Sequence, residues 1–135
     1  MIGRLVGSEM CIRDRIKIIQ NLYSKKSNPE ISIKYNKNQF KKFIKDVTEG
    51  TIEREELIDE IIEKNLKDDI NTNKTDKIIL IIIHAAIYEL LFKHNNNISV
   101  IISEYLKTAE VFLEKGKIAY LNAILDKISK ILRKS

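Results

Sequence analysis

The sequence predicts an all-α fold, a bundle of six helices. Apolar residues recur at spacings of three and four along nearly the whole chain, and no stretch keeps the alternating pattern of a half-buried strand. Helix-breaking residues are scarce, since the 135 residues include one proline and four glycines. A chain of this length suits one domain with a substantial core.

The first two helices are expected to flank a break at Pro29, because proline disfavours helical backbone at the residue before it. The first runs from before Ile16 to about Lys26, and the second from about Lys37 to about Glu49. Gly50 suits a left-handed cap at the end of the second helix. Apolar residues at core spacing are Ile18, Ile19, Leu22 and Tyr23 in the first helix and Phe40, Phe43, Ile44 and Val47 in the second.

The third helix is expected to be amphipathic and the fourth almost wholly apolar. Thr51 is the expected N-cap of the third. Three glutamates in its first turn interact favourably with the helix dipole: Glu53, Glu55 and Glu56. Its apolar stripe is Leu57, Ile58, Ile61, Ile62 and Leu66. After a loop at 68–74, Thr75 can cap the fourth helix, which contains the apolar run 78–92. That run is shorter than the roughly 20 residues of a membrane span, so we expect a buried central helix.

The last two helices are expected to pack around this central one. The fifth runs from about Ser99 to about Glu114 and is ended by Gly116. The sixth has one apolar face, formed by Ile118, Leu121, Leu125, Ile128 and Leu132.

The first fifteen residues differ in composition from the other 120. They hold the only cysteine, Cys11, and both methionines. Residues 5–14 match, without a mismatch, the translation of a transposase-linked adapter used in sequencing libraries, and the adapter specifies all but one base of the Arg15 codon. We interpret residues 1–15 as a non-native stretch and residues 16–135 as the domain, so that the native residues before Ile16 are missing. The alternative is an irregular N-terminal arm.

Charge is distributed unevenly along the chain. Residues 1–50 carry 11 Lys and Arg against 5 Asp and Glu, whereas residues 51–75 carry 4 against 8. The basic N-terminal half favours an anionic partner, above all a nucleic acid. The alternative is an ordinary lysine-rich surface.

No residue pattern supports an enzyme. His84 and His94 have no cysteine or carboxylate at ligand spacing beside them, and the sequence has no glycine-rich phosphate loop and no nucleophile elbow. Ser99 and Ser103 lack a base partner. We therefore predict no catalytic residue, no cofactor and no metal. Without Cys11 the chain has no thiol, which fits a reducing compartment such as the cytoplasm.

Four motifs occur in a fixed order: IQNLYS (19–24), AAIYELLF (85–92), VIISEYLKTAEVF (100–112) and AYLNAILDKI (119–128). Together they resemble the NusB family over essentially all of residues 16–135. The matching residues are Gln20, Leu22, Tyr23, Ala86, Tyr88, Glu89, Leu90, Ile102, Glu104, Ala109, Phe112, Asn122, Leu125 and Asp126. His84, Ser103 and Ala123 stand where the family usually has Arg, Asn and Gly. If the family's Arg pairs with the Glu matched by Glu104, His84 would replace that ion pair with a weaker hydrogen bond.

The resemblance implies a NusB-like helical bundle of two small subdomains that share one core. It also implies a bacterial transcription antitermination factor without a cofactor. Such proteins bind boxA, a single-stranded RNA element in the leaders of ribosomal RNA operons, together with the ribosomal protein NusE. The complex helps RNA polymerase to pass termination signals. The family's RNA surface includes an arginine-rich segment before and along the first helix, where residues 1–15 lie here.

The residues expected to bind RNA combine cations for the backbone with an aromatic platform for an unstacked base. Tyr23 is the expected platform, with a core tyrosine as the alternative, and Gln20 and Asn21 are expected to bond base edges. The full set is Arg15, Lys17, Gln20, Asn21, Tyr23, Lys25, Lys26, Lys115 and Lys117. A structural role is expected for His84, Glu89, Glu104, Asn122 and Asp126.

Two other functions fit the same pattern. The first is a helical protein-interaction module without an RNA role, acting as a homodimer. The second is the NusB-like accessory domain that is fused to RNA methyltransferases. The ending ILRKS is typical of a natural terminus, which argues against the fusion.

Overall fold

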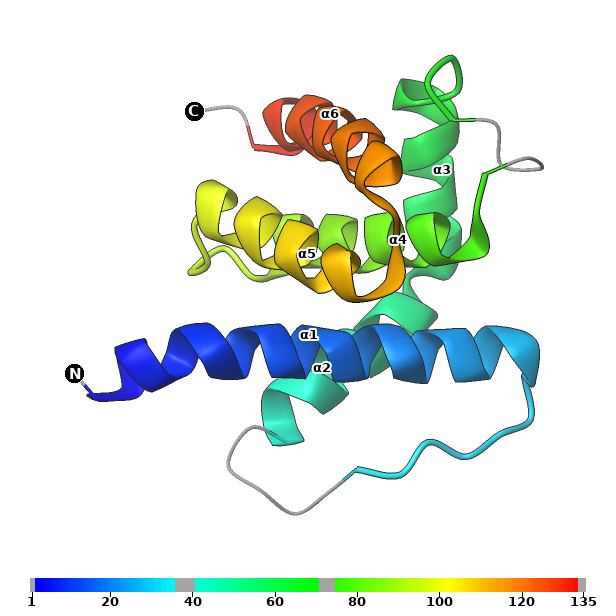
Figure 1. Cartoon of the computed structure of the whole chain (residues 1–135). Helices are drawn as coiled ribbons and strands as arrows, with labels where there is room; N and C mark the ends of the chain where they lie inside the picture. The colour runs from blue at the N-terminus through cyan, green and yellow to red at the C-terminus, as the bar shows by residue number, and fades with distance from the viewer. Residues whose placement is uncertain (1, 36–40, 71–74, 134–135) are drawn as a thin grey trace.

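The computed structural model describes the backbone of residues 2–35, 41–70 and 75–133, and the side chains of 12–35, 42–70 and 75–133. The described chain forms six helices (Figure 1): α1 (Ile2–Ser27), α2 (Lys41–Glu53), α3 (Glu55–Asn65), α4 (Lys77–Phe92), α5 (Ile98–Phe112) and α6 (Lys115–Leu132). The predicted all-α fold is confirmed. The expected start of the second helix at Lys37, its core residue Phe40, part of the 68–74 loop and the Cys11 side chain lie outside the described residues.

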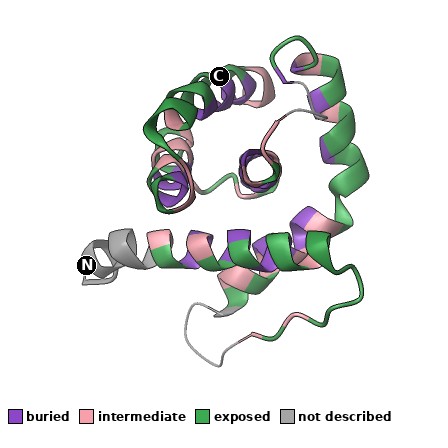
Figure 2. Ribbon diagram, turned by 45° about the vertical axis from the view of Figure 1, so that its right-hand side comes forward, coloured by how far each residue is buried: buried purple, intermediate pink, exposed green. Residues whose placement is uncertain are grey.

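Helix α4 is the centre of the bundle. It contacts each of the other five helices, and Figure 2, which looks nearly along it, shows them arranged around it. Its buried residues are Ile79, Ile81, Ile82, Ile83, Ala85, Ala86, Ile87, Glu89 and Leu90. The prediction of a buried central helix is confirmed. Among the described helices, none is long and apolar enough to cross a membrane.

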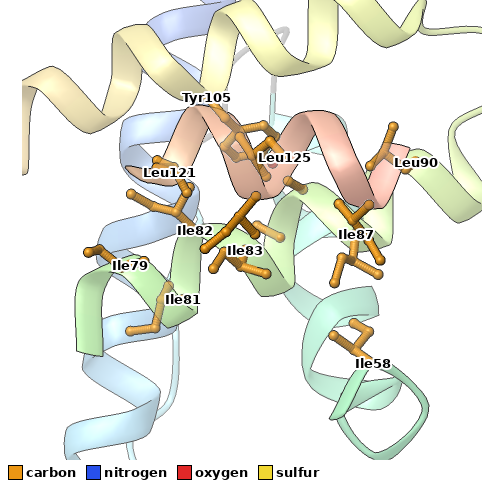
Figure 3. Packing of buried hydrophobic residues seen from close by; sticks show 14 of the residues in the cluster. Ile58, Ile79, Ile81, Ile82, Ile83, Ile87, Leu90, Tyr105, Leu121 and Leu125 are labelled. Carbon is orange, nitrogen blue, oxygen red and sulfur yellow. The ribbon is translucent and has the colours of Figure 1, made fainter. Parts of the chain in front are cut away.

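One hydrophobic cluster joins the two halves of the chain. Ile82 and Ile83 of α4 lie in the same cluster as Ile58 of α3 and as Tyr105 and Leu121 of α5 and α6 (Figure 3). Fully burying an isoleucine or leucine side chain contributes about 1.5–3 kcal/mol. Since α1–α3 and α4–α6 both contribute to this cluster, the two subdomains share one core, as expected.

The junction of α2 and α3 differs from the prediction. Gly50 lies inside α2, and no described glycine has a positive φ, so Gly50 is not a left-handed cap. The Tyr88 ring takes up the space beside it, because a Cβ built on Gly50 would lie 2.2 Å from Tyr88 Cζ. Thr51, the expected N-cap of α3, also belongs to α2 and donates its hydroxyl hydrogen to the Val47 carbonyl at 2.6 Å. Arg54 holds the N-cap position of α3.

The ends of α4 and α5 are set by neighbours of the predicted residues. Asp76, and not Thr75, caps α4, and its Oδ1 accepts from the Ile78 N–H at 3.3 Å. Leu113 and Glu114 have extended backbone, which ends α5 before the predicted stop at Gly116. Gly116 instead lies in the first turn of α6.

Candidate nucleic-acid interface

An exposed tyrosine and a lysine meet where α1 approaches the start of α4. Tyr23 on α1 is 42% exposed, and Lys77 Nζ lies 5.8 Å from the centroid of its ring. This distance is within the range of a cation–π contact. Asp76, next to Lys77, accepts a hydrogen bond from Lys117 Nζ of α6 at 2.9 Å. We call Tyr23, Lys77 and Lys117 the Tyr23 surface, which is assembled from three helices.

The ion pair on this surface fixes the charge of both partners. The hydrogen bond from Lys117 lowers the pKa of Asp76, although burial opposes this effect. The same hydrogen bond raises the pKa of Lys117. Both groups are therefore charged at neutral pH, and the pair holds the start of α6 against the start of α4.

Two more of the predicted RNA-binding residues extend the Tyr23 surface along α1. Lys17 and Gln20 are exposed on α1. Lys17, Gln20 and Tyr23 follow one another at spacings of three residues. Residues at this spacing lie on neighbouring turns of one helix face. Lys115 is exposed at the start of α6, close in sequence to Lys117. The surface thus combines cations, an amide and an aromatic ring, which are the groups that hold single-stranded nucleic acid.

Lys77 was missed from the sequence. Its partner Tyr23 is on another helix, so no local pattern connects the two residues. Only the packing of α1 against α4 brings them together.

Lys25 and Lys26 have partners outside the Tyr23 surface. Lys25 Nζ donates to the Ile31 carbonyl at 3.0 Å, and Lys26 Nζ pairs with Glu55 Oε2 at 3.0 Å. Both lysines line a groove together with residues of α3. Lys77, which contacts the ring of Tyr23, lines the same groove, and the assignment of Lys25 and Lys26 to RNA binding stays a prediction.

Arg15 does not lie on the surface, which corrects its assignment to RNA binding. Its side chain is 2% exposed, and its Nε and Nη2 donate to the Glu89 carboxylate at 3.0 and 2.6 Å. The guanidinium carbon also lies 5.2 Å from the ring centroids of Phe43 and Tyr105. Arg15 thus joins α1 to α2, α4 and α5 inside the bundle.

Asn21 is likewise turned inward, which corrects its assignment to a base edge. It is 7% exposed, and its side-chain nitrogen is buried without a hydrogen-bond partner among the described residues. An amide in this position is not accessible to a base.

The residues expected to be structural differ in how far they are buried. Glu89 is fully buried and accepts hydrogen bonds from Arg15, from the Tyr105 hydroxyl and from Asn96, so its structural role is supported. Asn122 and Asp126 are exposed on α6, so burial does not support their expected structural role. Asp126 pairs with Lys130, four residues along the same helix.

His84 and Glu104 do not pair, so the hydrogen bond that the sequence suggested in place of the family's Arg–Glu ion pair is absent between these two residues. His84 Nε2 lies 2.7 Å from Asp59 Oδ1, and its Nδ1 lies 2.7 Å from the Leu80 carbonyl. Glu104 is 6% exposed, and its Oε1 is buried with no hydrogen-bond partner in the part of the chain that the structure describes. His84 therefore links α4 to α3, while the Glu104 carboxylate is left partly unsatisfied.

Asp14 is poorly accommodated, and we expect its replacement by Asn to stabilise the protein at pH 7. Burial raises its pKa to about 6, although the neighbouring Arg15 acts to lower it. The folded state therefore binds this proton more tightly than the unfolded state does, and stability rises as the pH falls from about 6 to about 4. Asp14→Asn should add about 2 kcal/mol to the free energy of unfolding at pH 7.

Urea unfolding of both proteins between pH 4 and pH 7 measures this effect. The difference between them should shrink several-fold on going from pH 7 to pH 4, where Asp14 is protonated in the folded state and partly protonated in the unfolded state. A difference that stays constant with pH would mean that the Asp14 charge is not its cause.

Comparison with known proteins identifies the family. A sequence model of the NusB family matches residues 9–130. A transcription antitermination protein NusB of Mesorhizobium japonicum is 33% identical over 84 residues, which cover 62% of this chain and 54% of that protein. Proteins of the same name from Allorhizobium ampelinum and Novosphingobium aromaticivorans are 30% identical over 91 residues, covering 67% of this chain and 57% and 62% of their own lengths.

The chain spans only about half of the first of these relatives. No solved structure matches it significantly. The family match, however, extends over most of the chain, from a point before Arg15 to near the end of α6. The chain therefore belongs to the NusB family.

Proposed function

We propose that this protein is a transcription antitermination factor that binds boxA-type single-stranded RNA together with NusE. In this role it would act within the antitermination complex of RNA polymerase on ribosomal RNA operons. Membership of the NusB family and the names of its relatives support antitermination.

The Tyr23 surface is the observation that carries the RNA part of the proposal. An exposed aromatic ring can stack an unpaired base, while Lys77 beside it and Lys17 on the same face of α1 can neutralise phosphates. The ring lies on a helix packed into the bundle, so it is held in place before RNA binds. We assign Lys17, Gln20, Tyr23, Lys115 and Lys117 to the RNA surface from the original prediction, and we add Lys77.

Fluorescence anisotropy tests the proposal directly. A labelled boxA-like RNA and a scrambled RNA of equal length are titrated with the protein, with and without NusE. We expect tighter binding to the boxA-like RNA, strengthened further by NusE. Equal affinity for the two RNAs in the presence of NusE would contradict the proposal.

Tyr23→Ala should weaken RNA binding about tenfold or more, because stacking on an aromatic side chain contributes about 1–3 kcal/mol per base. Its effect on the free energy of unfolding should be about 1 kcal/mol or less, since the ring is half exposed. Anisotropy titration and urea unfolding of the same variant measure the two effects.

Phe92 provides a matched control at the other end of α4. It is 39% exposed, and Arg54 Cζ lies 5.0 Å from its ring centroid, so it too is an exposed ring beside a cation. We expect Phe92→Ala to leave RNA affinity unchanged. An equal loss of affinity in both variants would show that Tyr23 does not stack a base.

A further inference from the structure

The segment that follows α1 is fastened at two points. Near its start, Lys25 Nζ of α1 donates to the Ile31 carbonyl at 3.0 Å. Farther along, the Tyr35 hydroxyl donates to Glu49 Oε2 of α2 at 2.6 Å. Figure 1 shows residues 28–35 running beneath α1, on the side away from α5 and α6. The two hydrogen bonds therefore tie this segment both to α1 and to α2.

Three exposed lysines are grouped at Tyr35. Lys34 directly precedes it in the chain, and Lys45 Nζ of α2 lies 5.9 Å from the centroid of its ring. This distance is just within the range of a cation–π contact. Lys42 comes three residues before Lys45 and therefore lies on the same face of α2. We call Lys34, Tyr35, Lys42 and Lys45 the Tyr35 surface.

Carboxylates do not neutralise these three lysines. None of the three has an ion-pair partner among the described residues. The nearby carboxylates of α2 have other partners, because Asp46 pairs with Lys93 at 3.5 Å and Glu49 accepts from Tyr35. In the sequence, residues 31–45 include five lysines and no aspartate or glutamate. The Tyr35 surface therefore carries a net positive charge, even with Glu49 at its edge.

The bond between Tyr35 and Glu49 holds Lys34 against α2 before a ligand binds. Burial, the hydrogen bond to Glu49 and the negative charge of Glu49 all raise the pKa of Tyr35 well above its usual value. The hydroxyl is therefore protonated at neutral pH and keeps donating to Glu49. A cation whose backbone is already fixed loses less conformational freedom on binding than one on a loose chain.

We propose that the Tyr35 surface binds the phosphates of RNA that flanks the boxA-type element, an inference that rests on the proposed function. Exposed cations without carboxylate partners neutralise phosphates whatever the base sequence is. The ring of Tyr23 lies beside Lys77 of α4, whereas residues 28–35 run on the opposite side of α1 (Figure 1). An RNA held at the Tyr23 surface can pass around α1 and reach the Tyr35 surface with its flanking nucleotides.

The length of the RNA tests the Tyr35 surface. Three labelled RNAs are compared by fluorescence anisotropy: the boxA-like element alone, and the element with about ten uridines added at its 5′ end or at its 3′ end, a length typical of single-strand binding sites. Each RNA is titrated with the wild-type protein and with the double variant Lys34→Gln, Lys45→Gln. The titrations are repeated at several salt concentrations, because phosphate contacts make affinity depend on salt.

The double variant Lys64→Gln, Lys67→Gln is the matched control. Like the test pair, it removes one exposed lysine of a helix and one exposed lysine outside the helices, and both lie at the far end of α3. Neither lysine has an ion-pair partner in the described part of the chain. The two double variants change the net charge equally. Glutamine is about as good a helix former as lysine, so both should fold.

We expect the wild-type protein to bind one of the extended RNAs about three- to tenfold more tightly than the element alone. The variant Lys34→Gln, Lys45→Gln should lose this gain, while its affinity for the element alone should change less than about twofold because distant charges are screened. For the extended RNA, its slope of log K against log salt should be shallower by about 1.4, since each phosphate contact contributes about 0.7. The control should keep both the gain and the slope.

Three results would overturn the Tyr35 surface and leave the proposed function standing. The first is selective binding of the element with no gain from either extension. The second is a gain that both double variants lose equally, which would report only their net charge. The third is a gain that neither variant loses. If the wild-type protein does not distinguish the element from a scrambled RNA, the RNA part of the proposed function fails, and this inference fails with it.

Discussion

Replacement of Arg15 by methionine should strongly destabilise the protein. It leaves the fully buried Glu89 carboxyl without its cationic partner. Removing one member of a buried ion pair costs about 3–5 kcal/mol. For a domain of this size we expect the melting temperature to fall by roughly 10 °C or more. Urea unfolding followed by circular dichroism measures the change in free energy.

The loss should arise from the unpaired charge and not from lost volume. Burial and the negative charge of Glu89 raise the pKa of Tyr105 well above its usual value, so the Tyr105 hydroxyl stays protonated and keeps donating to Glu89. That hydrogen bond alone cannot replace the guanidinium. In the double variant Arg15→Met with Glu89→Gln, most of the stability should return, because a neutral amide is less costly to bury.

An exposed pair supplies the control for this prediction. Lys130→Met breaks the pair with Asp126, in which the lysine side chain is 75% exposed, and should cost less than about 1 kcal/mol. If Arg15→Met costs no more than Lys130→Met, water or a proton must be reaching Glu89. The Arg15 pair would then not hold α1 to α4.

Arg15 and Asp14 differ in how well the fold accommodates them. Arg15 meets a carboxylate and two aromatic rings, whereas the Asp14 carboxyl has its pKa raised by burial. The adapter translation specifies Asp14 fully but leaves one base of the Arg15 codon open. Both residues lie in the stretch 1–15 that we predict to be non-native, and this prediction accounts for the poor accommodation of Asp14 but not for the packing of Arg15. The boundary between the foreign stretch and the domain remains a prediction.

The helices could be predicted because burying one face of a helix requires apolar residues at spacings of three and four. The ends of the helices could not be fixed in the same way. Thr75 and Asp76 are both competent N-caps, and only the backbone conformation selects Asp76. Thr51 is also a good N-cap, but the chain continues as α2 through it.

The candidate site was predicted less well than the fold because its contacts join distant parts of the chain. Glu89 is 74 residues from Arg15, and arginine is rarely buried, so nothing local indicated the pair. For Asn122 and Asp126 a signal was present. Each follows a core residue of α6, Leu121 and Leu125, and therefore lies beside the apolar face, not within it.

Gly50→Ala should lower the free energy of unfolding by about 1–3 kcal/mol, the usual cost of overpacking. The new methyl group would lie 2.2 Å from Cζ and 2.5 Å from Cε1 of the Tyr88 ring. That ring also packs on Phe92, with centroids 5.0 Å apart, so it cannot move without losing this contact. The clash must also exceed the gain of about 1 kcal/mol that alanine brings to a helix interior. Urea unfolding measures the net effect.

The sign of this effect should reverse when the tyrosine side chain is removed. In a Tyr88→Ala background the three atoms nearest to the new methyl group are gone, so Gly50→Ala should raise the free energy of unfolding by about 1 kcal/mol through helix propensity. A capping glycine gives a different result, because alanine in a left-handed conformation is strained whatever residue 88 is. Destabilisation in both backgrounds would therefore restore the cap predicted from the sequence. A reversal of sign would show that Gly50 is needed for the close approach of Tyr88 to α2.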